Sequence, residues 1–111
     1  MEIKLLNKLV DNFILEKNPW IESYEWKQTY REYGEKYDSD LFFLVIYVKP
    51  DVQKTLSEFN LEYEFSSQKK DDLFKIFGFL NKMFGNQLKV INITIYFRNP
   101  ITGYLYSAKK L

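Results

Sequence analysis

Pairs of carboxylates are the residues of this chain whose types and spacing come closest to a chemical site. The sequence contains no histidine and no cysteine, so acid–base catalysis would have to use Asp, Glu, Lys, Tyr or Ser. The same absence excludes zinc sites of the Cys/His type, disulfides, thiol chemistry and serine triads that depend on histidine. Two neighbouring carboxylates could transfer a proton or hold a divalent cation. The pairs with suitable spacing are Glu22 with Glu25, Asp38 with Asp40, Glu62 with Glu64, and Asp71 with Asp72.

Each pair also has an ordinary structural role. The pair at Glu62 falls on the water-facing side of an expected strand. The pair at Asp71 lies in the first turns of an expected helix, where acidic side chains favour the helix dipole. Segment 38–40 has the D-x-D spacing of a calcium loop, but the rest of that pattern is missing. We therefore expect no catalytic residue, no metal site and no cofactor, and we do not expect an enzyme.

Aromatic residues are the more unusual feature, because they make up 19% of the chain. That share exceeds the need of a core of this size, so some rings should lie at a surface or an interface. Codon bias in an A/T-rich genome is the alternative explanation. Residues 20–31 alternate with period two, which predicts a strand with one aromatic and one polar face. The aromatic face and its continuation are our candidate interaction surface: Trp20, Tyr24, Trp26, Tyr30, Tyr33 and Tyr37.

Three interpretations of this aromatic face stay open. It can be a core face beneath a helix, which is the common role of aromatic residues at strand spacing. It can be a protein interface, where Trp and Tyr with interspersed charges are typical. It can be a stacking platform for single-stranded nucleic acid, with Lys27, Arg31 and Lys36 near the phosphates.

The charge balance disfavours the nucleic-acid interpretation. The chain has 16 basic and 15 acidic residues, a net charge of +1 and a pI near 7.8. A dedicated duplex binder usually carries a clear basic excess, because the neutralisation of phosphates drives its affinity. Arg31 and Arg98 are the only arginines, although arginine is the preferred fork for phosphates and base edges.

The longest unbroken apolar run, residues 41–48, is the element that should organise the rest. It is rich in β-branched and aromatic residues, which predicts a central strand buried on both faces. It is too short for a transmembrane helix, which needs about 20 apolar residues. Apolar residues at helical spacing predict amphipathic helices over 3–16 and 68–84. The remaining expected elements are a short helix at 51–59 and strands at 61–65, 90–97 and 104–108.

Together these elements predict one α+β domain over residues 1–111. We expect a mainly antiparallel sheet of about five strands with two amphipathic helices, in the order α-β-β-(short helix)-β-α-β-β. With the helices on one face of the sheet, the other face would carry the excess aromatics. The N-terminus begins an amphipathic helix and not a signal peptide, and no transmembrane segment is expected. We therefore predict a cytoplasmic protein, or one assembled into a particle after cytoplasmic synthesis.

No family motif is present. In the order of its expected elements the chain resembles small phage head–tail connector and tail-terminator proteins, and this resemblance implies ring assembly through sheet edges and loops. Our first hypothesis is a non-enzymatic interaction or structural subunit of viral or phage type that binds a protein partner or copies of itself. The alternative is a single-stranded nucleic-acid-binding module that uses the aromatic strand face. The third hypothesis is a small-ligand binder or enzyme that uses carboxylates, Tyr and Lys.

Overall fold

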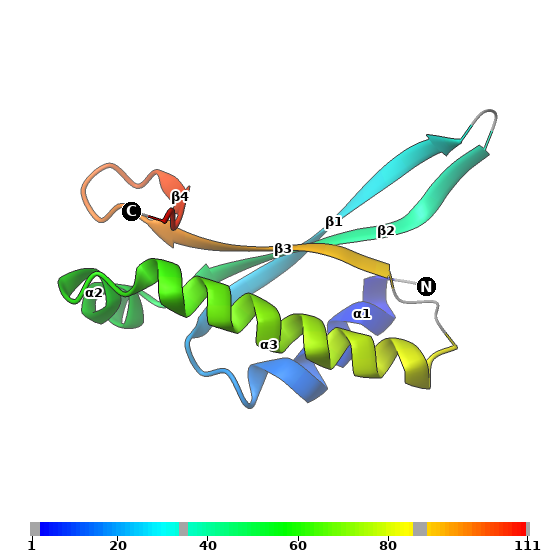
Figure 1. Cartoon of the computed structure of the whole chain (residues 1–111), viewed down its shortest axis with the longest axis horizontal. Coiled ribbons are helices and arrows are strands. Elements are labelled where there is room, and N and C mark those ends of the chain that lie inside the picture. The colour runs from blue at the N-terminus through cyan, green and yellow to red at the C-terminus, as the bar shows by residue number, and fades with distance from the viewer. Residues whose placement is uncertain (1–2, 34–35, 86–88, 111) are drawn as a thin grey trace.

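The described residues form three helices and a four-stranded sheet in the computed structural model (Figure 1). The structure describes residues 3–33, 36–85 and 89–110, with the side chains of these residues except 3, 28–33, 36–40 and 89. The predicted α+β class is confirmed. In chain order the elements are α1 (Ile3–Val10), its π-helical extension η1 (Asp11–Leu15), β1 (Ile21–Tyr33), β2 (Lys36–Val48), α2 (Pro50–Glu58), α3 (Glu62–Met83), β3 (Lys89–Arg98) and β4 (Leu105–Ser107).

The strands lie side by side in the order β1-β2-β3-β4, and only β2 and β3 run parallel. A parallel pair needs a long connection, because the chain must return to the end at which the first strand began. Here α2 and α3 make that return. The sheet is therefore mixed and mostly antiparallel, and α1 and α3 lie on the same side of it (Figure 1).

Strand β2 contains the apolar run and occupies a central position, as predicted. It pairs with β1 on one side and with β3 on the other. Phe42, Leu44 and Ile46 are fully buried members of the core. Val45 is buried as well, although the alternation of the strand turns its side chain to the opposite face of the sheet. It is buried there because β1 and β3 flank β2 on both sides.

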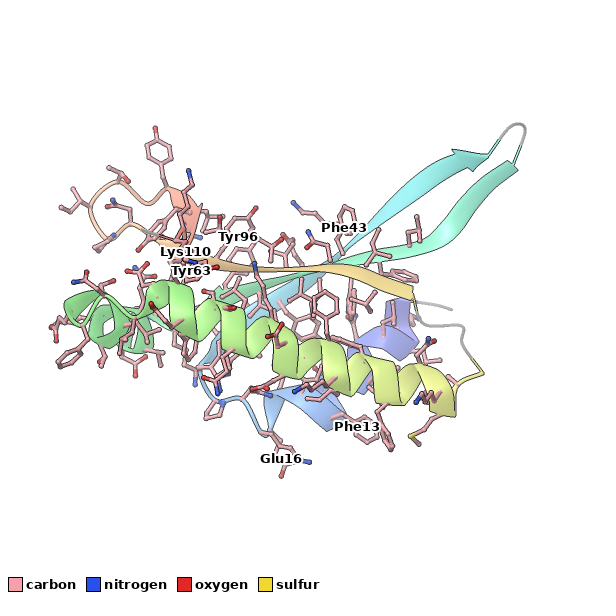
Figure 2. All side chains as sticks on the ribbon, in the orientation of Figure 1. Phe13, Glu16, Phe43, Tyr63, Tyr96 and Lys110 are labelled. Carbon is pink, nitrogen blue, oxygen red and sulfur yellow. The ribbon has the colours of Figure 1, made fainter. Side chains whose placement is uncertain are left out.

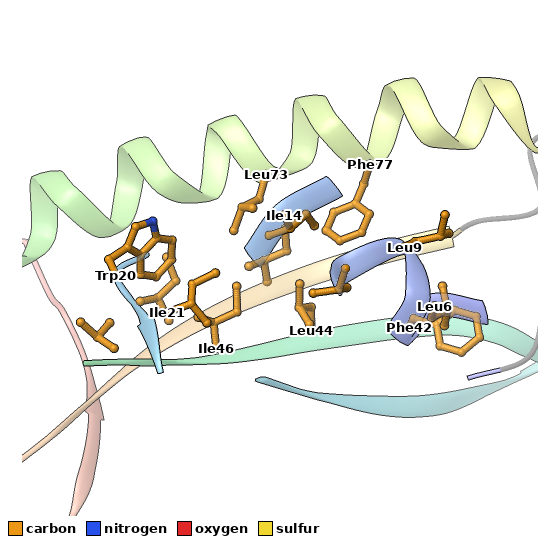
Figure 3. Close-up of a cluster of buried hydrophobic side chains, with 14 of the residues drawn as sticks. Leu6, Leu9, Ile14, Trp20, Ile21, Phe42, Leu44, Ile46, Leu73 and Phe77 are labelled. Carbon is orange, nitrogen blue, oxygen red and sulfur yellow. The ribbon is translucent and has the colours of Figure 1, made fainter. Parts of the chain in front are cut away.

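The core fills the space between the sheet and the helices (Figure 3). The N-terminal helix contributes Leu6 and Ile14, and α3 contributes Leu73 and Phe77. Full burial of one such side chain is worth roughly 1.5–3 kcal/mol. These contacts fix both helices to one face of the sheet.

The strand predicted over residues 61–65 does not form, because this segment is the first part of α3. The alternation of Leu61, Glu62, Tyr63, Glu64 and Phe65 also fits a helix, since residues four apart share one helix face. The Phe65 amide donates to the Leu61 carbonyl over 3.0 Å, and the Phe65 ring packs edge-on against Trp20 with centroids 5.2 Å apart. The sheet consequently has four strands and not five. Asn60, with φ of 54°, separates α2 from α3.

Two irregular pairings change which side chains face the core. Between Ile21 and Ser23 the register with β2 shifts, so Ile21 is buried opposite Val48. A second shift in β3 places Val90 opposite Phe42 and Asn92 opposite Phe43, which leaves Ile91 without a partner position on β2 and 47% exposed. Such bulges insert one residue into a strand and reverse the alternation beyond it.

Candidate interaction surface

The aromatic residues just before and within the first part of β1 pack toward the helices. Trp20 is 6% exposed. Trp26 is half-buried, and its ring makes edge contacts with Phe42 at 6.0 Å and with Phe77 at 5.8 Å between centroids. Tyr24 is also half-buried against the core. Of the three interpretations of the aromatic face, the core interpretation describes these three residues.

Tyr24 connects the N-terminal helix to the sheet. Its hydroxyl lies 2.9 Å from Asp11 Oδ1 and 3.3 Å from the Asn7 carbonyl oxygen. Burial, and then the hydrogen bond to Asp11, raises the pKa of Tyr24 to about 12. The neutral hydroxyl is therefore the form that the fold stabilises.

The other three aromatic candidates lie on a two-stranded extension of the sheet. The described pairing of β2 with β3 begins at Leu41, and Leu41 lies opposite Thr29 of β1, so the described pairing of residues 30–33 and 36–40 is only with each other. We call these two segments the arm, and Figure 1 shows it projecting beyond the helices. The candidates whose backbone lies on the arm are Tyr30, Tyr33, Tyr37, Arg31 and Lys36, and their side chains are outside those that the structure describes. The structure therefore does not test their proposed roles.

The sheet face opposite the helices carries a set of residues that the first aromatic pattern missed. We call it the open face, and Figure 2 shows Phe43 and Tyr96 pointing away from α3 on this side. The pairing register aligns its residues in three rows across the strands. The rows are Lys27–Phe43–Asn92, Glu25–Val45–Thr94 and Ser23–Tyr47–Tyr96.

Tyr47 makes a hydrogen bond and a ring contact on the open face. Its hydroxyl donates to Glu25 Oε1 over 2.7 Å, and its ring stacks on Tyr96 with centroids 6.1 Å apart. The hydrogen bond to Glu25 is the main cause that raises the pKa of Tyr47, followed by burial. Phe43, Tyr47 and Tyr96 remain partly exposed, as expected for residues that contact a partner. The signal for this surface was the second parity of the central run, which the sequence alone assigned to a buried face.

A cleft of about 920 Å³ opens where the sheet ends against α2 and the β3–β4 turn. One stripe of α2 forms a wall, and the floor contains Gln53, which is 8% exposed. The Gln53 amide accepts from the Arg98 backbone N–H over 2.8 Å and donates to the Arg98 carbonyl oxygen. Because β2 ends at Val48, this amide takes the place of a neighbouring strand. The β3–β4 turn forms the other wall. The Arg98 guanidinium stabilises this turn, because it donates to the Gly103 carbonyl over 2.9 Å.

A smaller cleft of about 590 Å³ lies between the start of α3 and β4, and Tyr106 lines both clefts. The Ser57 hydroxyl donates to Glu62 Oε1. Burial, and then the neighbouring Glu62 carboxylate, raises the pKa of Tyr106. These contacts tie α2, α3 and β4 together, and they give Glu62 a structural role.

The carboxylate pairs whose side chains the structure describes lie in different surroundings. No group of three or more Asp, Glu, His or Cys side chains that could hold a metal ion occurs in the described part of the chain. Glu22 lines the cleft, whereas Glu25 bonds Tyr47 on the open face. Asp71 and Asp72 are exposed residues in the interior of α3, because the helix begins earlier than predicted. The side chains of Asp38 and Asp40 are outside those that the structure describes.

Comparisons with protein-family models, curated proteins and solved structures find no significant match to this chain. The resemblance to phage connector and tail-terminator proteins therefore rests on element order, from which the structure removes one strand. Among the described helices, none is long and apolar enough to cross a membrane.

Proposed function

We propose that the chain is a non-enzymatic interaction or assembly subunit that binds protein through the open face and the edge of β1. The observation that carries this proposal is the pair of stacked, partly exposed tyrosines, Tyr47 and Tyr96, on the face of the sheet opposite α1 and α3 (Figures 1 and 2). Tyrosine supplies large contact area at low entropic cost and is enriched among residues that dominate binding energy.

The charges on the open face favour protein over nucleic acid. Among its described residues, Glu25 stands next to Lys27 on β1, so this part of the face lacks the basic excess that phosphate binding requires. Alternating charges beside aromatic rings are instead typical of a polar interface rim. The single-strand alternative therefore depends on the arm, which carries Arg31 and Lys36.

A small-ligand binder is the second candidate, and the cleft of about 920 Å³ is the observation that favours it. Its size suits an organic ligand. The charges that line this cleft are mixed: two are acidic, Glu22 and Glu58, and two are basic, Lys54 and Arg98. Binding of a fragment library monitored by amide NMR shifts of α2 would test this candidate, and the absence of shifts in α2 would reject it.

Substitution on the open face tests the protein-binding proposal. Tyr96→Ser removes one ring of the stacked pair, and Tyr63→Ser is the matched control on α3, on the helix side of the sheet (Figure 2). Proteins captured from the source organism by the tagged wild type are identified, purified and titrated against all three baits by calorimetry. Self-association is measured in parallel.

We expect Tyr96→Ser to weaken the interaction by about tenfold or more, because buried tyrosines are frequent hot spots. Tyr63→Ser should change the affinity by less than about twofold. Equal affinity of every partner for wild type and Tyr96→Ser would reject the open face as the binding surface. Salt-dependent binding of a single-stranded oligonucleotide, lost on Tyr30→Ala, would instead establish the alternative.

A further inference from the structure

Strand β1 is an edge of the sheet and pairs only with β2 among the described strands. Every second residue of an edge strand directs its N–H and C=O outward, where another strand can pair with them. The pairing of β1 with β2 is irregular between Ile21 and Ser23 and again between Thr29 and Arg31. Irregularities bend an edge and end its ability to pair. The regular part between them, residues 23–29, is the segment open to a further strand, and we call it the edge segment.

We infer that the edge segment pairs antiparallel with the edge segment of a second copy, about a two-fold axis at Trp26. This inference rests on the proposed function and names the partner. The edge segment extends equally to both sides of Trp26, so its two regular halves match in this register. Glu25 of each copy then lies opposite Lys27 of the other, and the symmetry forms this pair twice.

The neighbouring registers are electrostatically worse. A two-fold axis at Lys27 would place the two Lys27 side chains directly opposite each other. A two-fold axis at Glu25 would do the same to the two Glu25 carboxylates. Like charges directly opposite on paired strands are destabilising, whereas opposite charges stabilise. The charge pattern therefore selects the register that the two irregular ends also select.

The side chains are placed to make these pairs. Glu25 and Lys27 are both exposed on the open face. Tyr47 holds one oxygen of the Glu25 carboxylate at 2.7 Å, which orders the carboxylate without neutralising it. Residues directly opposite on antiparallel strands have Cβ atoms about 4.5–5.5 Å apart, within reach of a Glu–Lys pair. On the helix side, the half-buried Trp26 rings meet at the axis. The paired sheets become continuous, with the two open faces joined.

Charge reversal tests the register. Sedimentation equilibrium over a range of concentrations is compared for wild type, Glu25→Lys, Lys27→Glu and the double variant. Each single change turns two attractive pairs into two repulsive pairs, so dimerisation should weaken by about tenfold or more. The double variant restores opposite charges and should return to within about threefold of wild type. Added salt should weaken the wild-type dimer.

Folding is controlled within the same set. Glu25→Lys removes the acceptor of Tyr47, but Lys27→Glu leaves that hydrogen bond in place. If Glu25→Lys lowers the melting temperature, a weaker dimer could result from lost folding. Two variants separate the causes, because Lys27→Glu reverses the charge and keeps the Tyr47 hydrogen bond, whereas Tyr47→Phe removes the hydrogen bond and keeps the charges.

A wild type that stays monomeric at all concentrations would overturn the inference, as would single variants that dimerise as tightly as wild type. A double variant that stays monomeric would overturn the Glu25–Lys27 pairing. None of these results removes the proposed function, which fails only if Tyr96→Ser also leaves every protein interaction unchanged. Pairing of β1 with a strand of a different protein would reject the second copy while keeping the proposed function.

Discussion

Gln53 makes hydrogen bonds to the last residue of β3, beyond the end of its parallel pairing with β2. Its replacement should destabilise the fold measurably. The side chain is buried and makes two hydrogen bonds to the backbone of Arg98. Each bond contributes about 0.5–1.5 kcal/mol, and a backbone group left without a partner adds a desolvation cost. Because the site lines a cleft, water can satisfy part of that loss. We therefore expect Gln53→Met, which keeps the side-chain length, to lower the free energy of unfolding by about 2 kcal/mol.

Chemical denaturation measures this loss of free energy. In thermal unfolding, the same loss should lower the melting temperature by roughly 8 °C for a chain of this size. Gln53→Glu is the sharper variant, because its carboxylate still accepts from the Arg98 N–H but cannot donate to the Arg98 carbonyl. It should lose at least as much as Gln53→Met. The exchange of the Arg98 amide hydrogen should accelerate in both variants, while that of Ile95 within the β2–β3 ladder should not. Variants within about 0.5 kcal/mol of wild type would refute the bridging role of Gln53.

Three further predictions concern two glycines and the hydroxyl of Tyr24. Gly78 is an exposed residue inside α3, and a Cβ there meets no atom within 4 Å. Gly78→Ala should therefore stabilise the protein by about 0.5–1 kcal/mol. Gly103→Ala should cost about 1–2 kcal/mol, because Gly103 has φ of +74° with equally free space; equal melting temperatures of the two variants would contradict this. For Tyr24, the folded pKa of about 12 exceeds the unfolded value, which is about 10. Its stabilising contribution is therefore complete below pH 10 and declines as the pH rises toward 12. Stability measured against pH should fall less steeply in Tyr24→Phe than in wild type, and parallel curves would contradict the assignment.

The sequence predicted the parts of the fold that depend on local apolar patterns. The run at 41–48 indicated the central strand, and the spacing of Leu73, Phe77 and Leu80 indicated a helix that packs on it. These signals are strong because burial of many side chains on one face leaves a long, regular pattern.

The errors arose where the pattern was short or the register changed. Residues 61–65 fit both a strand and a helix, and in the structure they begin α3, where Phe65 packs against Trp20. The irregularity after Ile21 depends on the pairing with β2 and has no local signal. The role of Gln53 also depends on where β2 ends relative to β3.

The open face was not among the surfaces that the sequence singled out. The alternation in β1 predicted one aromatic face but did not say which face of the sheet the helices would cover. Three residues of that aromatic face, Trp20, Tyr24 and Trp26, face the core. The partly exposed rings of Tyr47 and Tyr96 come together from strands far apart in sequence, so no local pattern could pair them.

Hydrogen exchange of β1 tests the central claim that this edge and the open face bind protein. The exchange rates of residues 23–29 are measured at low and high protein concentration and in the presence of any partner identified with the wild type. The account predicts that these amides gain protection on association, while those of the exposed side of α3 do not. Unchanged exchange of residues 23–29 and of the open-face strands in every complex would contradict it.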